Sequence, residues 1–237
     1  MAPSEAKWKL PAKLAFGISA LVLVFLNWWT QPVLWDNFQL SVPKIGQFRF
    51  LETHKLYLGL LFFTVFFPFL ASFERKRVHF AGLWKYFFPG NLLVAAIFIL
   101  WDVHFTQIGV WCFNPDYLTG LRLLGLPWEE WAFFTCVPFS CTFIYEVLHF
   151  YFPKPPLLRD ERAITVFLLL IFGAIAVLNW SKIYTSTTFL LCGILLAYHF
   201  LFFKNVERAR FYLAYLISWI PFLLVNGILT GALTDKP

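Results

Sequence analysis

Long apolar runs separated by short polar loops follow one another along the whole chain. Several of them approach or exceed the roughly 18 residues that an α-helix needs to cross a bilayer. Because lipid offers the backbone no hydrogen-bond partner, such runs cross the membrane as helices. The predicted spans are 14–34, 56–73, 86–101, 128–150, 163–180, 187–203 and 211–233. The pattern therefore predicts an all-α, polytopic helical membrane protein with about seven transmembrane helices.

Composition agrees with this class. Hydrophobic residues make up 60% of the chain, charged residues only 14%, and mean hydropathy is +0.69, whereas a soluble domain carries about a quarter charged residues. The net charge is +6, but the basic residues fall in short loops, as in polytopic proteins that fix their orientation this way. We therefore expect a multi-pass protein of the cell membrane and no nucleic-acid partner.

The basic residues also test the number of spans. With the N-terminus inside, most of the 19 lysine and arginine residues fall on the cytoplasmic side; without the first span they would divide almost evenly. The first span has Asn27, Thr30 and Gln31 near its far end, so an uncleaved signal-anchor is the alternative interpretation. On the seven-span count, the start of the run 128–150 lies at the outer face.

A weak internal repeat relates residues 73–100 to residues 203–229. Each stretch runs from a basic loop through aromatic residues to a proline and an asparagine, and then becomes apolar. The predicted organisation has four parts. These are a transmembrane N-terminal extension (1–55), a first three-helix repeat (56–152), a linker with one transmembrane helix (153–186) and a second, apparently incomplete repeat (187–237).

The chemistry-bearing residues gather where one span ends and the next begins. Asp102 closes the third span, and Glu129 and Glu130 follow Pro127 at the start of the fourth. Because consecutive antiparallel helices meet at this end, the three acids should share a small aromatic region, in which His104 and Arg122 are the nearest cations. Crowding and burial both disfavour ionisation, so at least one carboxyl should stay protonated and donate a proton to a weakly basic, lipid-soluble substrate.

A structural role is the competing interpretation of the glutamates. Pro127 suits a first helical turn, and acids just after it complement the positive end of the helix dipole. A belt of tryptophans at the membrane interface would surround them. These rules explain one carboxylate better than two, and they leave both interpretations open.

A second polar group, Tyr145, Glu146 and His149, lies about 25 Å further along the fourth helix. Glu146-x-x-His149 has the spacing of half a di-iron site, but the matching pair on another helix is absent, and the four cysteines show no C-x-x-C spacing. We therefore expect no metal, and we expect Glu146 to pair with Lys154 or another basic loop residue. Nucleotide-binding, GxSxG and HExxH motifs are also absent.

These residues resemble the membrane-embedded lycopene cyclase domain family, whose members act as paired small subunits or as fused repeats. The match runs from about Tyr57 to Phe152. Its motifs are FFPF (66–69), WKYFFP (84–89), the pair Trp101–Asp102, GVWCFNPDYLTG (109–120), LPWEEW (126–131) and VPFSCTFIYE (137–146). The hallmark Pro-x-Glu-Glu/Asp motif is Pro127-Trp128-Glu129-Glu130 here.

The resemblance implies cyclisation of the linear ends of a carotenoid, lycopene, into β-ionone rings by an isomerase (an intramolecular lyase). Glu129 and Glu130 are the expected acid and base, in an order that the sequence does not assign, and Asp102 is a supporting carboxylate. Aromatic faces stabilise a carbocation without trapping it. The residues expected to bind substrate are Trp101, Trp111, Pro127, Trp128, Trp131, Phe134, Tyr145 and Glu146.

Fused members carry a second acidic motif after the second repeat, and this chain stops where that motif should begin, so either the chain is truncated or a partner supplies that half. A second cyclase subunit or a second copy of the chain is therefore a candidate partner. No cofactor motif is evident, and the need for a flavin or a quinone is left open, as are the ring type and the number of ends cyclised. The alternatives are one-ended cyclisation, hydration, or a transporter or scaffold whose acids bind a cation; spans nearly free of internal charge disfavour the last.

Overall fold

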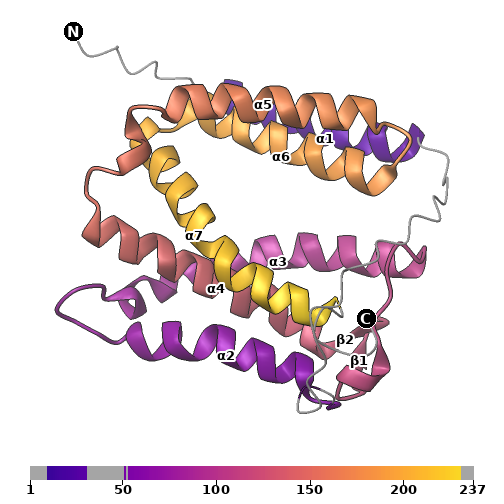
Figure 1. Cartoon of the computed structure of the whole chain (residues 1–237). Coiled ribbons are helices and arrows are strands. Elements are labelled where there is room, and N and C mark those ends of the chain that lie inside the picture. The colour runs from indigo at the N-terminus through magenta and orange to yellow at the C-terminus, as the bar shows by residue number, and fades with distance from the viewer. Residues whose placement is uncertain (1–9, 31–50, 52, 231–237) are drawn as a thin grey trace, which may run out of the picture. The chain divides into compact units, whose positions relative to one another are not determined.

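The computed structural model describes residues 10–30, 51 and 53–230, and within them the fold is all-α, as predicted (Figure 1). Seven α-helices there correspond one for one to the predicted spans. They are α1 (Leu10–Thr30), α2 (Leu56–Ala71), α3 (Trp84–Gln107), α4 (Trp128–Tyr151), α5 (Glu161–Leu178), α6 (Ile183–Phe202) and α7 (Asn205–Leu229). The loops hold short 3₁₀ helices at Phe80–Leu83, Pro115–Tyr117 and Pro156–Leu158, and a hairpin of β1 (Arg122–Leu123) and β2 (Leu126–Pro127).

Five of these helices, α3 to α7, are long and apolar enough to cross a membrane. The second helix and the stretch Lys13–Phe25 of the first are apolar but shorter, so the exact number of spans stays a prediction. Large apolar side chains such as Leu178 (82% exposed) and Ile220 (75% exposed) lie on the surface, where lipid rather than water suits them. The chain is a multi-pass helical membrane protein.

Some expectations fall outside the described residues. The end of the first predicted span, with Gln31, and the last seven residues of the second repeat lie there. The four-part division and the orientation in the membrane also stay predictions.

The described chain forms two compact units. The first contains α1, α5, α6 and α7 as far as Phe211, and α6 packs against both α5 and α1. Its polar centre is Arg208, which is 5% exposed. The guanidinium donates to the Glu161 carboxylate and to the carbonyl oxygens of His199 and Phe203. This buried cation therefore joins the starts of α5 and α7 to the end of α6.

The second unit contains α2, α3, α4 and α7 from Tyr212, and α4 packs against both α2 and α3. Pro68 inside α2 has no N–H, so it leaves the carbonyl of Thr64, four residues earlier, without its helical donor. Ser140 of α4 supplies the missing hydrogen: its Oγ lies 2.8 Å from Thr64 O and 3.0 Å from Cys136 O. A neighbouring helix thus satisfies a carbonyl that lipid could not.

The contact between α3 and α4 follows the same rule. Pro138 inside α4 frees the carbonyl of Phe134, and the amide of Asn91 on α3 donates to this oxygen at 3.1 Å. The carbonyls that Pro68 and Pro138 leave open therefore accept the hydrogen bonds that hold α4 against its neighbours. Ser140 links α4 to α2, and Asn91 links α3 to α4.

The hairpin leads the chain into α4. Leu124 and Gly125 have φ values of 52° and 84°, as a tight two-residue hairpin turn requires, and Leu123 pairs with Leu126. The backbone N–H of Trp128 then donates to Leu121 O at 3.1 Å. Pro127 is therefore the last residue of β2, directly before the helix, rather than in the first helical turn as expected.

Candidate active site

Glu129 in the first turn of α4 is completely buried. The backbone N–H and the hydroxyl of Thr119 each donate to its Oε1 at 2.7 Å. The indole N–H of Trp128 donates to the same Thr119 hydroxyl at 2.6 Å. Among the described residues, the other oxygen of Glu129, Oε2, is buried and has no hydrogen-bond partner. One carboxylate oxygen is thus held in place while the second stays available.

Glu130 lies beside it and is partly buried. Its Oε2 accepts a hydrogen bond of 2.5 Å from the phenol of Tyr57, which is on α2 and 6% exposed. Tyr57 also interacts electrostatically with Glu129 and Asp102, and Asp102 interacts with Glu130. The three acids of α3 and α4 therefore lie within electrostatic range of one phenol, which is in direct contact with Glu130.

Asp102, near the end of α3, is 4% exposed. The indole of Trp111 donates to its Oδ1 at 2.7 Å, while Oδ2 is buried without a partner among the described residues. Trp111 stacks on Phe105 with a centroid distance of 5.3 Å, and Phe105 contacts Trp101 at 4.9 Å. Asp102 is thus bordered by three aromatic rings in contact.

The remaining predicted residues of this region help to build its frame. Pro127 is fully buried. The indole of Trp131 donates to Leu123 O at 3.2 Å, which ties α4 to the hairpin. Phe134 stacks on Phe98 of α3 at 6.4 Å. Arg122, expected near the acids, donates to Gly125 O in its own turn instead.

Tyr145 and Glu146 are not part of this cluster. They lie on α4 about four helical turns from Glu130, roughly 24 Å away. The imidazole Nδ1 of His149 is 3.6 Å from Glu146 Oε2, so the structure pairs Glu146 within its own helix, where Lys154 had been expected. Within the described residues, no group of three potential ligands is placed to hold a metal ion.

Tyr57 and Thr119 are the site residues that the sequence did not single out. Thr119 lies inside GVWCFNPDYLTG, and its side chain carries no chemistry that sets it apart. Tyr57 is one tyrosine of nine and lies 73 positions from its partner Glu130. No spacing rule relates residues on separate helices, so only the packing of α2 on α4 brings this phenol to the acids.

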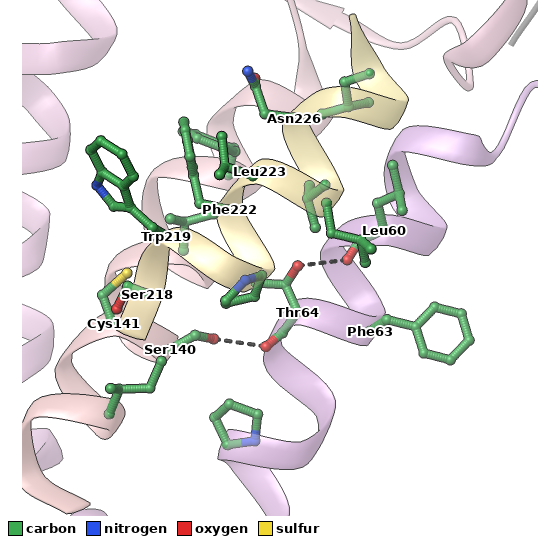
Figure 2. A pocket seen from close by; sticks show the side chains of 18 of the residues that line it. Leu60, Phe63, Thr64, Ser140, Cys141, Ser218, Trp219, Phe222, Leu223 and Asn226 are labelled. Atoms are coloured by element: carbon green, nitrogen blue, oxygen red, sulfur yellow. Dashed lines mark hydrogen bonds between the residues drawn. The ribbon is translucent and has the colours of Figure 1, made fainter. Parts of the chain in front are cut away.

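A cavity of about 730 Å³ opens along the same two helices and Tyr215–Leu229 of α7 (Figure 2). Leu60 and Thr64 of α2, Val137 and Ile144 of α4, and Trp219 and Phe222 of α7 are among its lining residues. The first of these residues on α2, Leu60, follows Tyr57 by one helical turn. The cavity therefore begins about one helical turn from Tyr57, the residue that donates to Glu130.

The arrangement suits proton transfer to and from an apolar molecule. Two neighbouring carboxyls differ in burial and in hydrogen bonding, which is how one fold provides an acid and a base together. Low-polarity surroundings strengthen their interaction with any positive charge that forms nearby.

No curated protein and no solved structure matches the chain. The family model described as lycopene cyclase matches residues 54–148 and 181–237, well over half of the sequence. The first of these ranges contains α2 to the greater part of α4, with Tyr57, Asp102, Thr119, Glu129 and Glu130. On this match, the chain belongs to the lycopene cyclase family.

Proposed function

We propose that this protein is a lycopene β-cyclase of the cell membrane, which closes the linear ends of lycopene into β-ionone rings. The observation that carries the proposal is the carboxyl pair itself. Glu129 is wholly buried, one of its oxygens has no hydrogen-bond partner among the residues that the structure describes, and Glu130 beside it accepts from Tyr57. A buried carboxylate oxygen without a donor lowers stability, and a role as catalytic acid or base explains why such an oxygen is kept.

The reaction begins when the protonated carboxyl adds its proton to the terminal carbon–carbon double bond. The electron pair of that bond forms the new C–H bond and leaves a tertiary carbocation. The neighbouring double bond then attacks the cation, which closes a six-membered ring and moves the positive charge into it. The ionised carboxyl removes a ring proton, and the electrons of that C–H bond form the ring double bond. Acid and base have exchanged roles, and the formula of the hydrocarbon is unchanged.

The groups around the acidic pair stabilise the positive charge of the carbocation. The acids favour a positive charge in the low-polarity region that they share. Each aromatic face adds about 0.5–2 kcal/mol of cation–π stabilisation, and the contacting rings of Trp101, Phe105 and Trp111 border Asp102. Asp102 therefore supports the two glutamates by its charge, while the choice of the proton removed sets the ring type.

The same chemistry bears on whether the protein needs a cofactor or a partner subunit. An isomerisation transfers no net electrons, so we expect turnover without added flavin or quinone. Lycopene has two ends, and a second cyclase subunit or a second copy of this chain would serve the other end.

Pigment analysis in lycopene-accumulating cells tests the proposal. Cells that produce the protein should convert lycopene to a carotene with β-ionone rings. Glu129→Gln and Glu130→Gln should each abolish conversion while the protein still accumulates in membranes. Glu74→Gln, at an exposed loop position outside the site, is the matched control and should retain activity.

The product also separates the alternatives. A ring at one end only, or a hydroxylated product, would replace the proposal with one-ended cyclisation or hydration. Unchanged lycopene with abundant wild-type protein would refute the cyclase function.

A further inference from the structure

Two of the helices that line the cavity, α2 and α4, also carry Tyr57 and Glu130. On α2, Tyr57, Leu60 and Thr64 follow at spacings of three and four residues, so they lie on one face. On α4, Glu130, Phe133 and Val137 have the same spacings and also lie on one face. Leu60, Phe133, Thr64 and Val137 line the cavity, and Tyr57 is hydrogen-bonded to Glu130. The phenol–carboxyl pair therefore stands about one helical turn beyond the end of the cavity.

The cavity is elongated. Its lining residues on α4 run from Phe133 to Ile144, which is roughly 17 Å along the helix axis. A volume of about 730 Å³ is within the range of roughly 300–1,000 Å³ that small-molecule sites occupy. The space thus has room for a long ligand that lies beside α4.

The walls offer very little hydrogen bonding. The Thr64 hydroxyl donates to Leu60 O at 2.8 Å, and the Ser140 hydroxyl donates to Thr64 O at 2.8 Å (Figure 2). The Ser140 hydroxyl also lies 3.0 Å from Cys136 O. The side chains of Cys141 and Ser218 interact with each other. Backbone carbonyls thus accept from the Thr64 and Ser140 hydroxyls, and one of these carbonyls, that of Thr64, is the one that Pro68 leaves open, so the walls suit a hydrocarbon rather than a polar molecule.

The lining also contains a side-chain amide, that of Asn226, at the end of the cavity near the acids. It precedes Leu229 by three residues, and Leu229 packs against the buried cluster of Tyr57, Leu61 and Leu118. The cavity is therefore lined mainly by apolar side chains, with the Asn226 amide toward the carboxyls and the Tyr215 phenol among the other lining residues of α7.

We propose that this cavity between α2, α4 and Tyr215–Leu229 of α7 holds the part of the substrate's polyene chain next to the reacting end and directs that end to Tyr57 and Glu130. The inference rests on the proposed function, since it takes the occupant to be a linear carotenoid. A lipid acyl tail is the competing occupant. The cavity holds no group that reacts with the chain; it positions the double bond that the acids protonate.

Bound lycopene in an inactive variant tests this inference without any turnover. The Glu130→Gln variant, purified in mild detergent from lycopene-accumulating cells, should retain lycopene, measured by absorbance per mole of protein. Adding Val137→Trp should lower the retained lycopene about tenfold or more, because the indole fills the cavity and crowding of this kind opposes binding. Adding Val94→Trp, the same change at a half-exposed position of α3 outside the lining, should leave it unchanged.

Two further variants distinguish filling of the cavity from misfolding of the Val137→Trp variant. Val137→Ala widens the cavity and should retain lycopene, and Ile144→Trp should repeat the loss from the far end of the cavity. Absence of lycopene from the Glu130→Gln variant would overturn the inference. Equal retention with Val137→Trp and with Val94→Trp would do the same and would leave the cavity to lipid.

The proposed function is judged separately, by wild-type conversion in the same cells. Cyclic carotene together with unaffected binding in the Val137→Trp variant would contradict only the cavity assignment. Absence of cyclic carotene would contradict only the cyclase function.

Discussion

Tyr57 on α2 donates a hydrogen bond of 2.5 Å to Glu130 on α4, across 73 positions of the chain. The bond holds one member of the acidic pair at the end of an apolar cavity. Because a phenol can donate to a carboxyl oxygen without competing for its role as acid or base, Tyr57 is a positioning residue.

We expect Tyr57→Phe to lower turnover about 10- to 100-fold, since hydrogen bonds to charged groups contribute about 1.5–3 kcal/mol. The measurement is conversion by purified protein in vesicles that contain lycopene. KM should change little, because the phenyl ring still packs in place. The exposed Tyr86 of α3 provides the control: Tyr86→Phe should match the wild type. Normal turnover in Tyr57→Phe would show that the Tyr57 hydroxyl does not position Glu130 for catalysis.

Thr119 makes a second prediction. Thr119→Val removes the hydroxyl that donates to Glu129 and accepts from Trp128, while the backbone N–H still donates to the same carboxyl. We expect about tenfold lower turnover from the loss of one such bond. Thr142→Val is the control, since the Thr142 hydroxyl donates only to Pro138 O in its own helix. Equal activity of the two variants would show that the Thr119 hydroxyl is dispensable.

The link between proline and serine across α2 and α4 predicts a coupling in stability. Ser140→Ala leaves the Thr64 carbonyl without its donor, and such a loss costs about 1–3 kcal/mol. In a Pro68→Ala background, the restored backbone N–H of residue 68 can bond Thr64 O, so the same serine change should cost less. Thermal unfolding of the four proteins in detergent measures this double-mutant cycle. Additive effects would mean that Ser140 does not compensate for Pro68.

The buried ion pair of the first unit predicts a purely structural effect. Arg208→Met removes the guanidinium that donates to the Glu161 carboxylate and to the carbonyls of His199 and Phe203. Removing one partner of a buried pair costs about 3–5 kcal/mol, so the unfolding temperature should fall clearly. Arg77→Met, at an exposed position, should have little effect. Similar unfolding temperatures for the two variants would contradict the assigned role of Arg208.

Much of the fold could be predicted because lipid restricts it. Each apolar run became a helix, since no other conformation satisfies its backbone in the membrane. Helix ends were less predictable: α3 was expected to end at residue 101 and continues to Gln107. Asp102 and His104 lower hydropathy without interrupting the helical hydrogen bonds. The hairpin was missed because Leu124 takes a positive φ, which sequence rules reserve mainly for glycine and asparagine.

The part of the site that depends only on antiparallel consecutive helices could be predicted. Asp102 and Glu129 flank one connection, so antiparallel helices bring them together. Tyr57 and Thr119 were not predictable, because their partners depend on which helix packs beside α4 and on how the loop folds back. The substrate-binding roles assigned to Tyr145 and Glu146 stay predictions, and their place four turns from the acids gives them no contact with the carboxyl pair.

Proton transfer to the hydrocarbon is the central claim, and cyclisation in D₂O tests it most directly. Carboxyl protons exchange with solvent, so wild-type protein in vesicles made up in D₂O should place one solvent deuterium in each ring formed, measured by mass spectrometry of the cyclic product. Cyclic carotene without solvent deuterium would contradict acid catalysis by Glu129 and Glu130.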